Sequence, residues 1–341
     1  MASFADSVTL RQLRTLAAIE ASGSSTGAAR QLGLTQPAIT LQIRTLQDLV
    51  GLPLLRRTNE GTRLTEIGAD LAALHHRIHA ALSDSAAAIS AIKGLSAGVV
   101  AVGAVSTAKY FMPFAIAGFS RLHPKVQIKL SIGNRREILD ALRNYSLDVA
   151  VTGRPPEDMD LEQRLIGPHP HMIIASPSHR LALMRETPLS ALLDDTFIVR
   201  EPDSGTRLLM QRTFTNERFE PKVGMEIDSN ETIKQAVMAG LGVAFISGHT
   251  VATELADHRL IALDIVGMPI VRNWYVVNRR DRALLPPALA LAKFLSNESG
   301  RFLPDLSMLK GRAAASGDAD RSKTRSTRAN RRSRKPVRKG S

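Results

Sequence analysis

The sequence contains no cysteine and no long apolar run. Without cysteine, the chain cannot form disulfide scaffolds, thiolate zinc fingers, iron–sulfur clusters or a cysteine nucleophile. No apolar stretch approaches the roughly 18 residues that a membrane-spanning helix needs. The first residues also lack the basic and apolar regions of a secretory signal. We therefore expect a cytoplasmic protein with no membrane partner.

The common catalytic motifs are also missing. The sequence has no Gly-x-Ser-x-Gly elbow, no Walker sequence and no His-Glu-x-x-His. His75 and His79 are four residues apart, but no neighbouring carboxylate or cysteine completes a metal site. His169 and His171 are interpreted as hinge or core residues. We expect no enzyme activity, no catalytic cofactor and no bound metal.

Charge is distributed unevenly along the chain. The whole sequence carries a net charge of +13, but residues 311–341 alone carry +9 and the first 310 residues only +4. The last segment has no apolar periodicity, so we expect a disordered basic tail. The rest of the chain is long enough for two or three domains, and with 44% hydrophobic residues overall it can bury real cores.

Residues 8–65 have the pattern of three short helices followed by a hairpin. The expected helices cover about 10–22, 25–32 and 36–50, and the expected strands cover 54–58 and 62–65. Thr35 is placed to cap the third helix, and Pro37 lies in its first turn, where a missing N–H costs nothing. The block therefore predicts a helix–turn–helix with a wing.

The third helix has one apolar side and one side that suits the major groove of DNA. Ile39, Ile43, Leu46 and Val50 follow at helical spacing and predict a buried stripe. The opposite side carries Gln36, Pro37, Thr40, Leu41 and Arg44. We add Ser25 and Thr35 to the expected DNA-binding residues, and place Arg56, Arg57 and Arg63 of the hairpin against phosphates. The alternative is an ordinary solvated helix beside a basic hairpin.

Residues 66–94 predict one long helix. Apolar and small residues from Leu71 to Ile92 alternate spacings of three and four, which is typical of a heptad seam. The alternative is an ordinary helix that faces the core of its own domain. Because the helix lies between two blocks of domain size, we expect a dimerising linker.

Residues 95–303 alternate strand-like and helix-like runs, which predicts mostly parallel sheets in two lobes. Lobe I covers about 95–167 and 270–303, and lobe II about 168–269. Four polar segments are placed to cap helices where strands end, the edge that faces a ligand crevice in open α/β folds. With nearby cations, the expected effector-binding residues are Ser106, Thr107, Lys109, Asn134, Arg135, Arg154, Ser204, Thr206, Arg207, Ser229 and Asn230. The alternative is that these are ordinary helix caps.

The N-terminal block resembles the LysR-type transcriptional regulators in the segments Leu10-Arg-Gln-Leu, Ser25-Thr-Gly-Ala-Ala-Arg-Gln-Leu, Thr35-Gln-Pro-Ala-Ile-Thr-Leu-Gln-Ile and Arg63-Leu-Thr-Glu-Ile-Gly. The later block resembles the regulators of carbon-fixation (Calvin-cycle, RuBisCO) operons in Val105-Ser-Thr-Ala-Lys-Tyr-Phe, Gly153-Arg-Pro-Pro-Glu-Asp and Arg200-Glu-Pro-Asp-Ser-Gly-Thr-Arg. The resemblance implies a winged helix–turn–helix, a linker helix and a two-lobed, periplasmic-binding-protein-like effector domain. Leu41 stands where many members carry a basic or small polar residue.

These patterns favour an α/β DNA-binding transcriptional activator of carbon-fixation genes. Its expected partners are double-stranded operator DNA, RNA polymerase, a phosphorylated metabolite or nucleotide, and further copies of itself in a homodimer or homotetramer. Three alternatives remain open: a LysR-type regulator of another operon, a cytosolic enzyme acting on a small anion, and an architectural nucleic-acid binder that depends on the basic tail.

Overall fold

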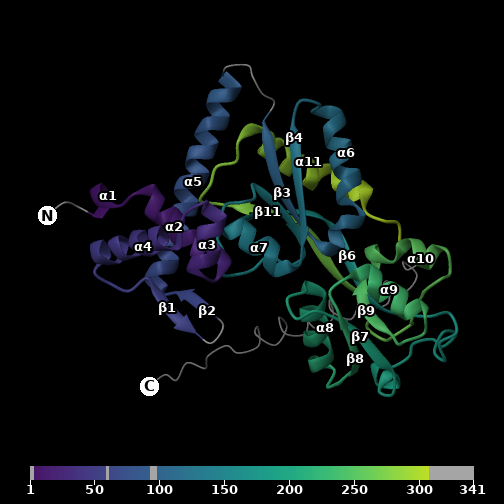
Figure 1. The fold of residues 1–341 in the computed structure, drawn as a ribbon. Helices are drawn as coiled ribbons and strands as arrows, with labels where there is room; N and C mark the ends of the chain where they lie inside the picture. The colour runs from purple at the N-terminus through teal and green to yellow at the C-terminus, as the bar shows by residue number, and fades with distance from the viewer. Residues whose placement is uncertain (1–3, 59–60, 93–97, 307–341) are drawn as a thin grey trace, which may run out of the picture. The chain divides into compact units, whose positions relative to one another are not determined.

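The computed structural model describes residues 4–58, 61–92 and 98–306 of the 341-residue chain (Figure 1). The chain divides into two compact units. The first contains Met1–Ala101 with the short stretches Lys125–Gln127 and Asp140–Asp148, and the second contains the remaining residues. The basic tail expected at 311–341 lies outside the described residues.

The first unit contains the predicted helix–turn–helix and hairpin. Its elements are α1 (Phe4–Ser7), α2 (Leu10–Ser22), α3 (Ser25–Leu32), α4 (Gln36–Val50), β1 (Leu55–Thr58), β2 (Gly61–Leu64) and α5 (Glu66–Ile92). Helix α1 was not predicted from the sequence, because it has only four residues and buries none of them. The other helices of this unit lie within about a residue of the predicted ranges.

Side-chain caps fix where the helices of this unit begin. Thr9 and Gln12 form a reciprocal capping box at the start of α2. The hydroxyl oxygen of Ser24 accepts from a backbone N–H at 3.0 Å, and that of Thr35 accepts from another at 3.4 Å. Gly33 ends α3 with a φ of +66°, which only glycine adopts at little cost. Polar residues at these places therefore set the register of the reading helix α4.

One apolar core holds this unit together. Ile39, Ile43 and Leu46 of α4 are buried as predicted, and they belong to the same core as the apolar face of α2. Val50, at the end of the helix, is only half-buried against this core. Leu71, Leu74 and Ile78 of α5 also pack against this core. The first half of α5 therefore packs against the core of its own unit. For this half, the alternative prediction of a core-facing helix is correct.

The second part of the chain is built around a mixed sheet with the strand order β10-β6-β11-β5-β3-β4, in which β9 also pairs with β6. The strands are β3 (Val99–Val105), β4 (Gln127–Gly133), β5 (Val149–Thr152), β6 (Leu161–Ala175), β7 (Thr196–Arg200), β8 (Lys222–Ile227), β9 (Ala244–Ser247), β10 (Ile261–Ala262) and β11 (Ile270–Arg279). The expectation of mostly parallel sheets is wrong for β6 and β11. Both pair antiparallel with their neighbours, whereas β3 with β5 and β7 with β8 are parallel.

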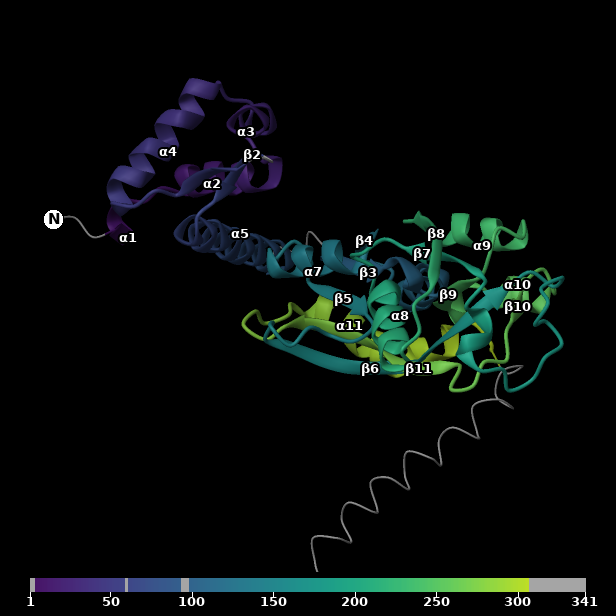
Figure 2. The same ribbon diagram turned by 90° about the horizontal axis from the view of Figure 1, so that it is seen from below.

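Helices cover the strands of both lobes (Figures 1 and 2). They are α6 (Met112–Leu122), α7 (Arg135–Arg143), α8 (Gly205–Asn216), α9 (Asn230–Met238), α10 (Ala252–Ala256) and α11 (Pro286–Glu298), with short 3₁₀ turns η1 (Ser106–Tyr110), η2 (Leu189–Leu192), η3 (Gly248–Thr250) and η4 (Ser299–Phe302). Within the described ranges, none of the helices combines the length and apolar character needed to cross a bilayer.

Two long strands, β6 and β11, connect the lobes. They pair along their length, from Leu161 opposite Arg279 to His171 opposite Ile270. We call the part around β3, β4 and β5 lobe I, and the part around β7, β8, β9 and β10 lobe II. In lobe II, one apolar cluster gathers around Phe197 and a second around Ile198, so neighbouring residues of β7 face two separate cores.

Candidate nucleic-acid interface and interlobe pocket

The predicted DNA-reading side of α4 is exposed. Gln36, Pro37, Thr40, Leu41 and Arg44 are all exposed, and 64% of the surface of Leu41 is open. The hydroxyl of Thr40 donates to the backbone oxygen of Gln36 at 3.0 Å. Because that hydroxyl proton is already used, the Thr40 oxygen is left to accept from a base amino group. The side chains therefore stand where a major groove could meet them.

The hairpin displays its three arginines beside the helix–turn–helix. Arg56 pairs with Arg63 and Arg57 pairs with Thr62 across the two strands, and all three arginine side chains are exposed. The N–H of Thr62 donates to the oxygen of Gly23 at 3.0 Å, which fixes the hairpin to the end of α2. A fixed basic wing can hold phosphates in a constant register without reading bases.

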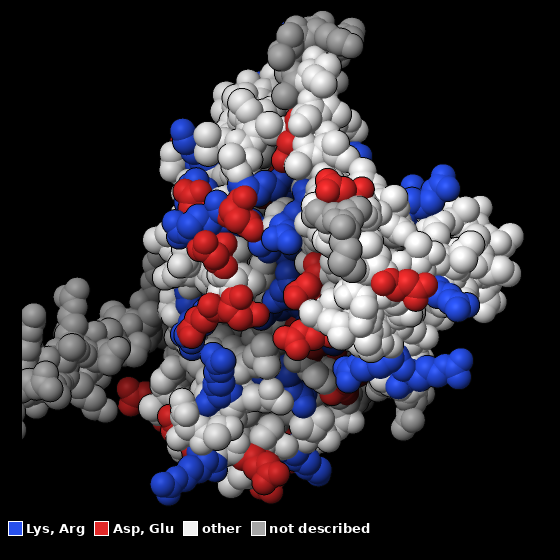
Figure 3. All heavy atoms as spheres, turned by 90° about the vertical axis from the view of Figure 1, so that its left-hand side faces the viewer, with Lys and Arg blue, Asp and Glu red and all other residues white. Residues whose placement is uncertain are grey.

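The two remaining candidates lie at helix starts. Ser25 is half-buried in the first turn of α3, where Ser24 and not Ser25 provides the cap. Thr35 is exposed and caps α4. Elsewhere charge is mixed, because Lys and Arg are interspersed with Asp and Glu on the face shown in Figure 3. This mixture fits the small net charge of the first 310 residues.

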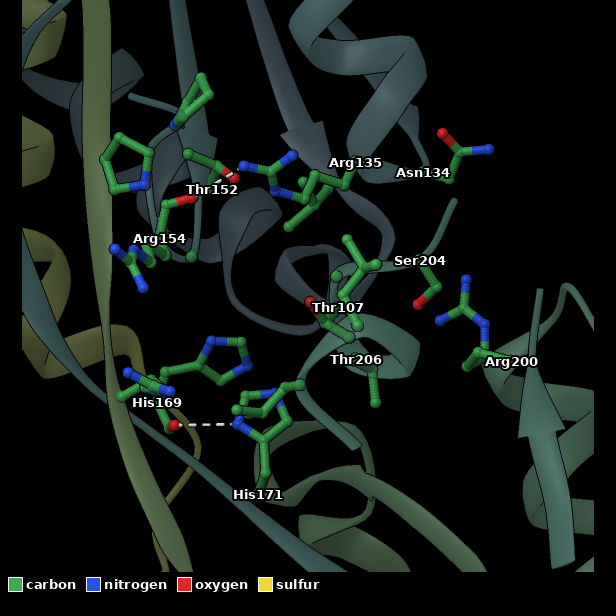
Figure 4. A pocket seen from close by; sticks show the side chains of 18 of the residues that line it. Thr107, Asn134, Arg135, Thr152, Arg154, His169, His171, Arg200, Ser204 and Thr206 are labelled. Carbon is green, nitrogen blue, oxygen red and sulfur yellow. Dashed lines mark hydrogen bonds between the residues drawn. The ribbon is translucent and has the colours of Figure 1, made fainter. Parts of the chain in front are cut away.

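A pocket of about 450 Å³ lies between the two lobes of the effector block (Figure 4). Seven of the predicted effector-binding residues line it: Ser106, Thr107, Asn134, Arg135, Arg154, Ser204 and Thr206. The structure thus brings together residues from η1, the start of α7, the segment after β5 and the start of α8, which are up to about a hundred positions apart in sequence. This convergence is the arrangement expected of a small-molecule site.

Four predicted residues do not line the pocket. Lys109 forms an ion pair with Glu231 at 3.6 Å. Arg207 donates to a backbone oxygen at 3.3 Å, and Ser229 caps α9. Asn230 is buried and accepts from Arg200 at 2.6 Å. Each of the four side chains therefore makes a contact in the structure that surrounds the pocket, although Nε of Arg207 and Nδ2 of Asn230 are buried without a partner in the described part of the chain.

The predicted caps are confirmed in part. Asn134 and Glu137 exchange two hydrogen bonds of 2.9 Å at the start of α7, and Ser229 caps α9 at 3.3 Å. Ser204 stands at the cap position of α8 without a side-chain bond. The prediction is wrong for Ser106, because the chain turns into η1 one residue earlier and the cap position falls on Val105.

The pocket is rich in positive charge. Its lining contains five arginines and two carboxylates: Arg135, Arg154, Arg200, Arg212, Arg272, Glu157 and Asp158. Arg154 pairs with Glu157. Burial lowers the pKa of Arg135, and the charges of Arg212 and Arg154 lower it further, whereas Asp158 raises it. An anion bound among these arginines would relieve their mutual repulsion.

Arg200 is a pocket residue that the sequence analysis missed. It is 3% exposed and donates to both carboxylate oxygens of Glu201, at 2.7 and 2.8 Å. It also donates to Asn230 of α9 and, at 3.3 Å, to Ser106 of η1. Since its donors are engaged, Arg200 acts as a positioning residue. A lone arginine at a strand end carries no sequence signal for such a role.

Two histidines also line the pocket, which the sequence analysis did not expect. His169 and His171 are 4% and 3% exposed, and their rings lie beside Thr107 and Thr206 in Figure 4. The ring of His169 stacks on Trp274 with 3.7 Å between centroids. Burial lowers the pKa of His171 to about 3 and that of His169 well below its usual range, so both rings are neutral at physiological pH.

The histidines of α5 form no metal site. His76 lies 3.7 Å from Glu20, and burial lowers the pKa of His75 to about 4. In the part of the chain that the structure describes, no group of three His, Asp or Glu side chains could hold a metal ion.

Comparison with known proteins accounts for both blocks. Residues 10–69 match the model "Bacterial regulatory helix-turn-helix protein, lysR family", and residues 93–300 match "LysR substrate binding domain". The "HTH-type transcriptional regulator CbbR" of Xanthobacter flavus is 48% identical over 301 residues, which are 87% of this chain and 90% of that protein. The "RuBisCO operon transcriptional regulator" of Allochromatium vinosum is 37% identical over 86% of this chain and 97% of its own.

A solved structure resembles the effector block. The regulatory domain of Synechocystis PCC6803 CcmR, in complex with 2-PG, is 33% identical and matches with a TM-score of 0.57. The match covers 61% of this chain and 99% of that domain. These relatives are regulators and not enzymes, which agrees with the lack of catalytic motifs. The protein therefore belongs to the LysR family of bacterial DNA-binding transcriptional regulators.

Proposed function

We propose that this regulator activates transcription of a carbon-fixation operon when a small anionic metabolite occupies the interlobe pocket. The observation that carries the operon assignment is the likeness to the Xanthobacter and Allochromatium proteins over nearly their whole length. The observation that carries the anionic ligand is the pocket lined by five arginines. A related domain holding 2-PG supports the same choice.

For DNA, we assign base reading to α4 and phosphate contacts to the hairpin. Gln36 can bond adenine with two hydrogen bonds, and Leu41 can pack on a thymine methyl group. The three arginines of β1 and β2 are exposed and extend from a hairpin that Thr62 fixes in place. An operator is the expected partner, and RNA polymerase is the expected recipient of the signal.

For assembly, we propose a homodimer that uses the outer part of α5, with a homotetramer as its larger form. Leu82 and Ile89 are seven residues apart on this helix and are 56% and 53% exposed. Apolar side chains spaced by one heptad form a seam that a second copy can bury. The first half of the helix is already used by the core of its own unit.

For the effector, we assign anion binding to Arg135, Arg154 and Arg212, which all line the pocket; the charges of Arg212 and Arg154 also lower the pKa of Arg135. Thr107 and Thr206 add hydroxyl groups to the lining. The start of α8 also lies at the pocket, and Ser204 at its cap position forms no side-chain bond there. A ligand held by both lobes shifts the regulator because it favours one arrangement of them over the other.

The test uses duplex DNA from the region upstream of carbon-fixation genes in the source genome. Purified protein should protect this DNA from nuclease, and phosphorylated metabolites should change the pattern of protection. Arg135→Gln should abolish that response, whereas Arg136→Gln should not, because Arg136 pairs with Asp203 and does not line the pocket. Protection only upstream of a different operon would support the alternative of another LysR-type regulator.

A further inference from the structure

His171 has a fixed tautomer. One of its ring nitrogens, Nδ1, lies 3.1 Å from the backbone oxygen of His169. A carbonyl oxygen can only accept, so Nδ1 carries the proton and donates. In a neutral imidazole the other nitrogen, Nε2, then presents a lone pair. The ring therefore offers an acceptor and no second donor.

The surroundings of His171 keep the ring neutral. The titratable and charged groups that face it are His169 on its own strand, His249 of η3 and Arg272 of β11. Burial is the largest cause of its low pKa, and His249 and Arg272 lower it further, whereas the bond to the His169 oxygen raises it. A protonated ring would place a second positive charge near Arg272, on a side chain that is itself buried, which is unfavourable.

The lone pair of His171 is unused by the protein. Among the described residues, Nε2 of His171 has no hydrogen-bond partner, although the side chain lines the pocket and is 3% exposed. The neighbouring ring also has one nitrogen without a partner among these residues. Nε2 of His169 lies 2.9 Å from the hydroxyl of Ser247, while Nδ1 is enclosed and unpaired. Because both rings line the pocket, a ligand bound there can pair with these nitrogens.

We infer that His171 selects an effector that carries a hydroxyl or amino donor in addition to its anionic group. The arginines cannot accept from such a donor, because a guanidinium has only donors. Neutral His171 accepts from the hydroxyl while the arginines bind the charge. The inference rests on the proposed anion-binding function and specifies which anions the same pocket prefers.

The experiment measures binding of matched anions to the full chain by isothermal titration calorimetry. The first pair is 3-phosphoglycerate and 3-phosphopropionate, which differ by one hydroxyl, and the second is ribose 5-phosphate and 2-deoxyribose 5-phosphate. In at least one pair the hydroxylated member should bind about tenfold more tightly, the value of one hydrogen bond to a neutral group. The ratio should stay constant from pH 6 to 8, because the ring stays neutral and the titration of the phosphate cancels within a pair.

The variants separate selection from structural support. His171→Phe should bring the two affinities of a pair together by weakening the hydroxylated member alone. His171→Gln should keep the preference, because its amide oxygen also accepts. His249→Gln is the control, since His249 accepts a hydrogen bond from Trp274 in the same aromatic stack but does not line the pocket.

Each remaining outcome has a defined meaning. Equal affinities within every pair that binds wild-type protein would overturn the role of His171. Equal weakening of both members in His171→Phe would show that the ring only supports the pocket, and would also overturn it. Failure of all four anions to bind would contradict the proposed anion pocket, and the inference would fail with it. The wild-type comparison needs no variant, so poor folding of a variant does not affect it.

Discussion

Arg200 of β7 donates to the hydroxyl oxygen of Ser106 in η1 at 3.3 Å, so a buried cation of lobe II contacts the first helical residue of lobe I. The same guanidinium bonds both oxygens of Glu201. Removal of one member of such a pair leaves the other charge without its partner in a site from which water is excluded. Arg200 is therefore one of the side chains that join the lobes, beside the ion pairs Lys109–Glu231 and Arg136–Asp203.

Substitution of Arg200 should destabilise the second unit strongly. We expect Arg200→Met to lower its free energy of unfolding by about 3–5 kcal/mol, because Glu201 would lose its buried partner. The measurement is urea unfolding followed by the fluorescence of Trp274, the one tryptophan of the chain, which is fully buried in this unit. Arg136→Met removes an exposed ion pair of 3.2 Å and should cost less than about 1 kcal/mol. Similar losses in both variants would contradict the role of Arg200.

Substitutions on α4 should separate specific from random binding. Gln36→Ala and Thr40→Ala should each weaken operator binding by about 1–3 kcal/mol and leave random DNA nearly unaffected, because they remove base contacts. Fluorescence anisotropy with labelled operator and scrambled duplexes measures both. Arg57→Ala is the comparison: it should weaken the two duplexes alike and reduce the salt dependence. Equal losses on both duplexes for Gln36→Ala would rule out base reading.

Stability of the second unit should fall in mild acid. Burial keeps the pKa of His171 at about 3 and that of His249 at about 4, whereas an unfolded histidine titrates near 6.5. Between these values the unfolded chain binds protons that the folded chain does not, so stability decreases as pH falls. The slope is about 1.4 kcal/mol per pH unit for each such ring. Unfolding followed by Trp274 at pH 7.5 and 5.5 measures it.

His249→Gln should reduce that loss, because it removes one buried ring while its amide oxygen can still accept from Trp274. A free energy of unfolding that is equal at the two pH values would show that the rings become protonated in the folded protein. His179→Gln serves as a control, since His179 lies outside this cluster of rings and contacts Asp195 at 3.2 Å.

Removal of the basic tail should alter affinity and leave specificity intact. Residues 311–341 carry a net charge of +9. Each phosphate that they contact adds about 0.9 to the slope of binding against salt on duplex DNA. A chain ending at Lys310 should therefore bind random DNA more weakly and with a flatter salt dependence, yet keep its operator preference. An unchanged slope would make the tail a solubilising segment, and lost preference would assign it base reading.

The helix–turn–helix could be predicted from sequence because its determinants are local. Thr35, Pro37 and Gly33 each act within a few residues of their own position, through a cap, a first turn and a positive φ. The periodicity of Ile39, Ile43 and Leu46 likewise needs no distant partner. The same locality explains why Asn134 was recognised as a cap before the pocket beside it was known.

The crossing strands and the pocket floor depend on distant contacts. Strand β6 contains Pro168 and Pro170, which lack the N–H of a ladder residue, so its first half was not recognised from sequence. Its partner β11 is about a hundred residues away, and their pairing supplies the order that local propensity lacks. His171 became a pocket residue only through this pairing, because its neighbours Phe245 and Arg272 come from other strands.

The pairing of β6 with β11 also makes lobe II an insertion whose two ends lie side by side. The chain leaves lobe I at Pro170 and returns to it at Val271. These two residues are paired across the antiparallel strands β6 and β11. A gene that encodes a short reverse turn in place of residues 171–270 would leave 161–170 and 271–279 as a simple hairpin. Sensor halves with other ligand preferences could be exchanged at the same two positions without changing the reading head.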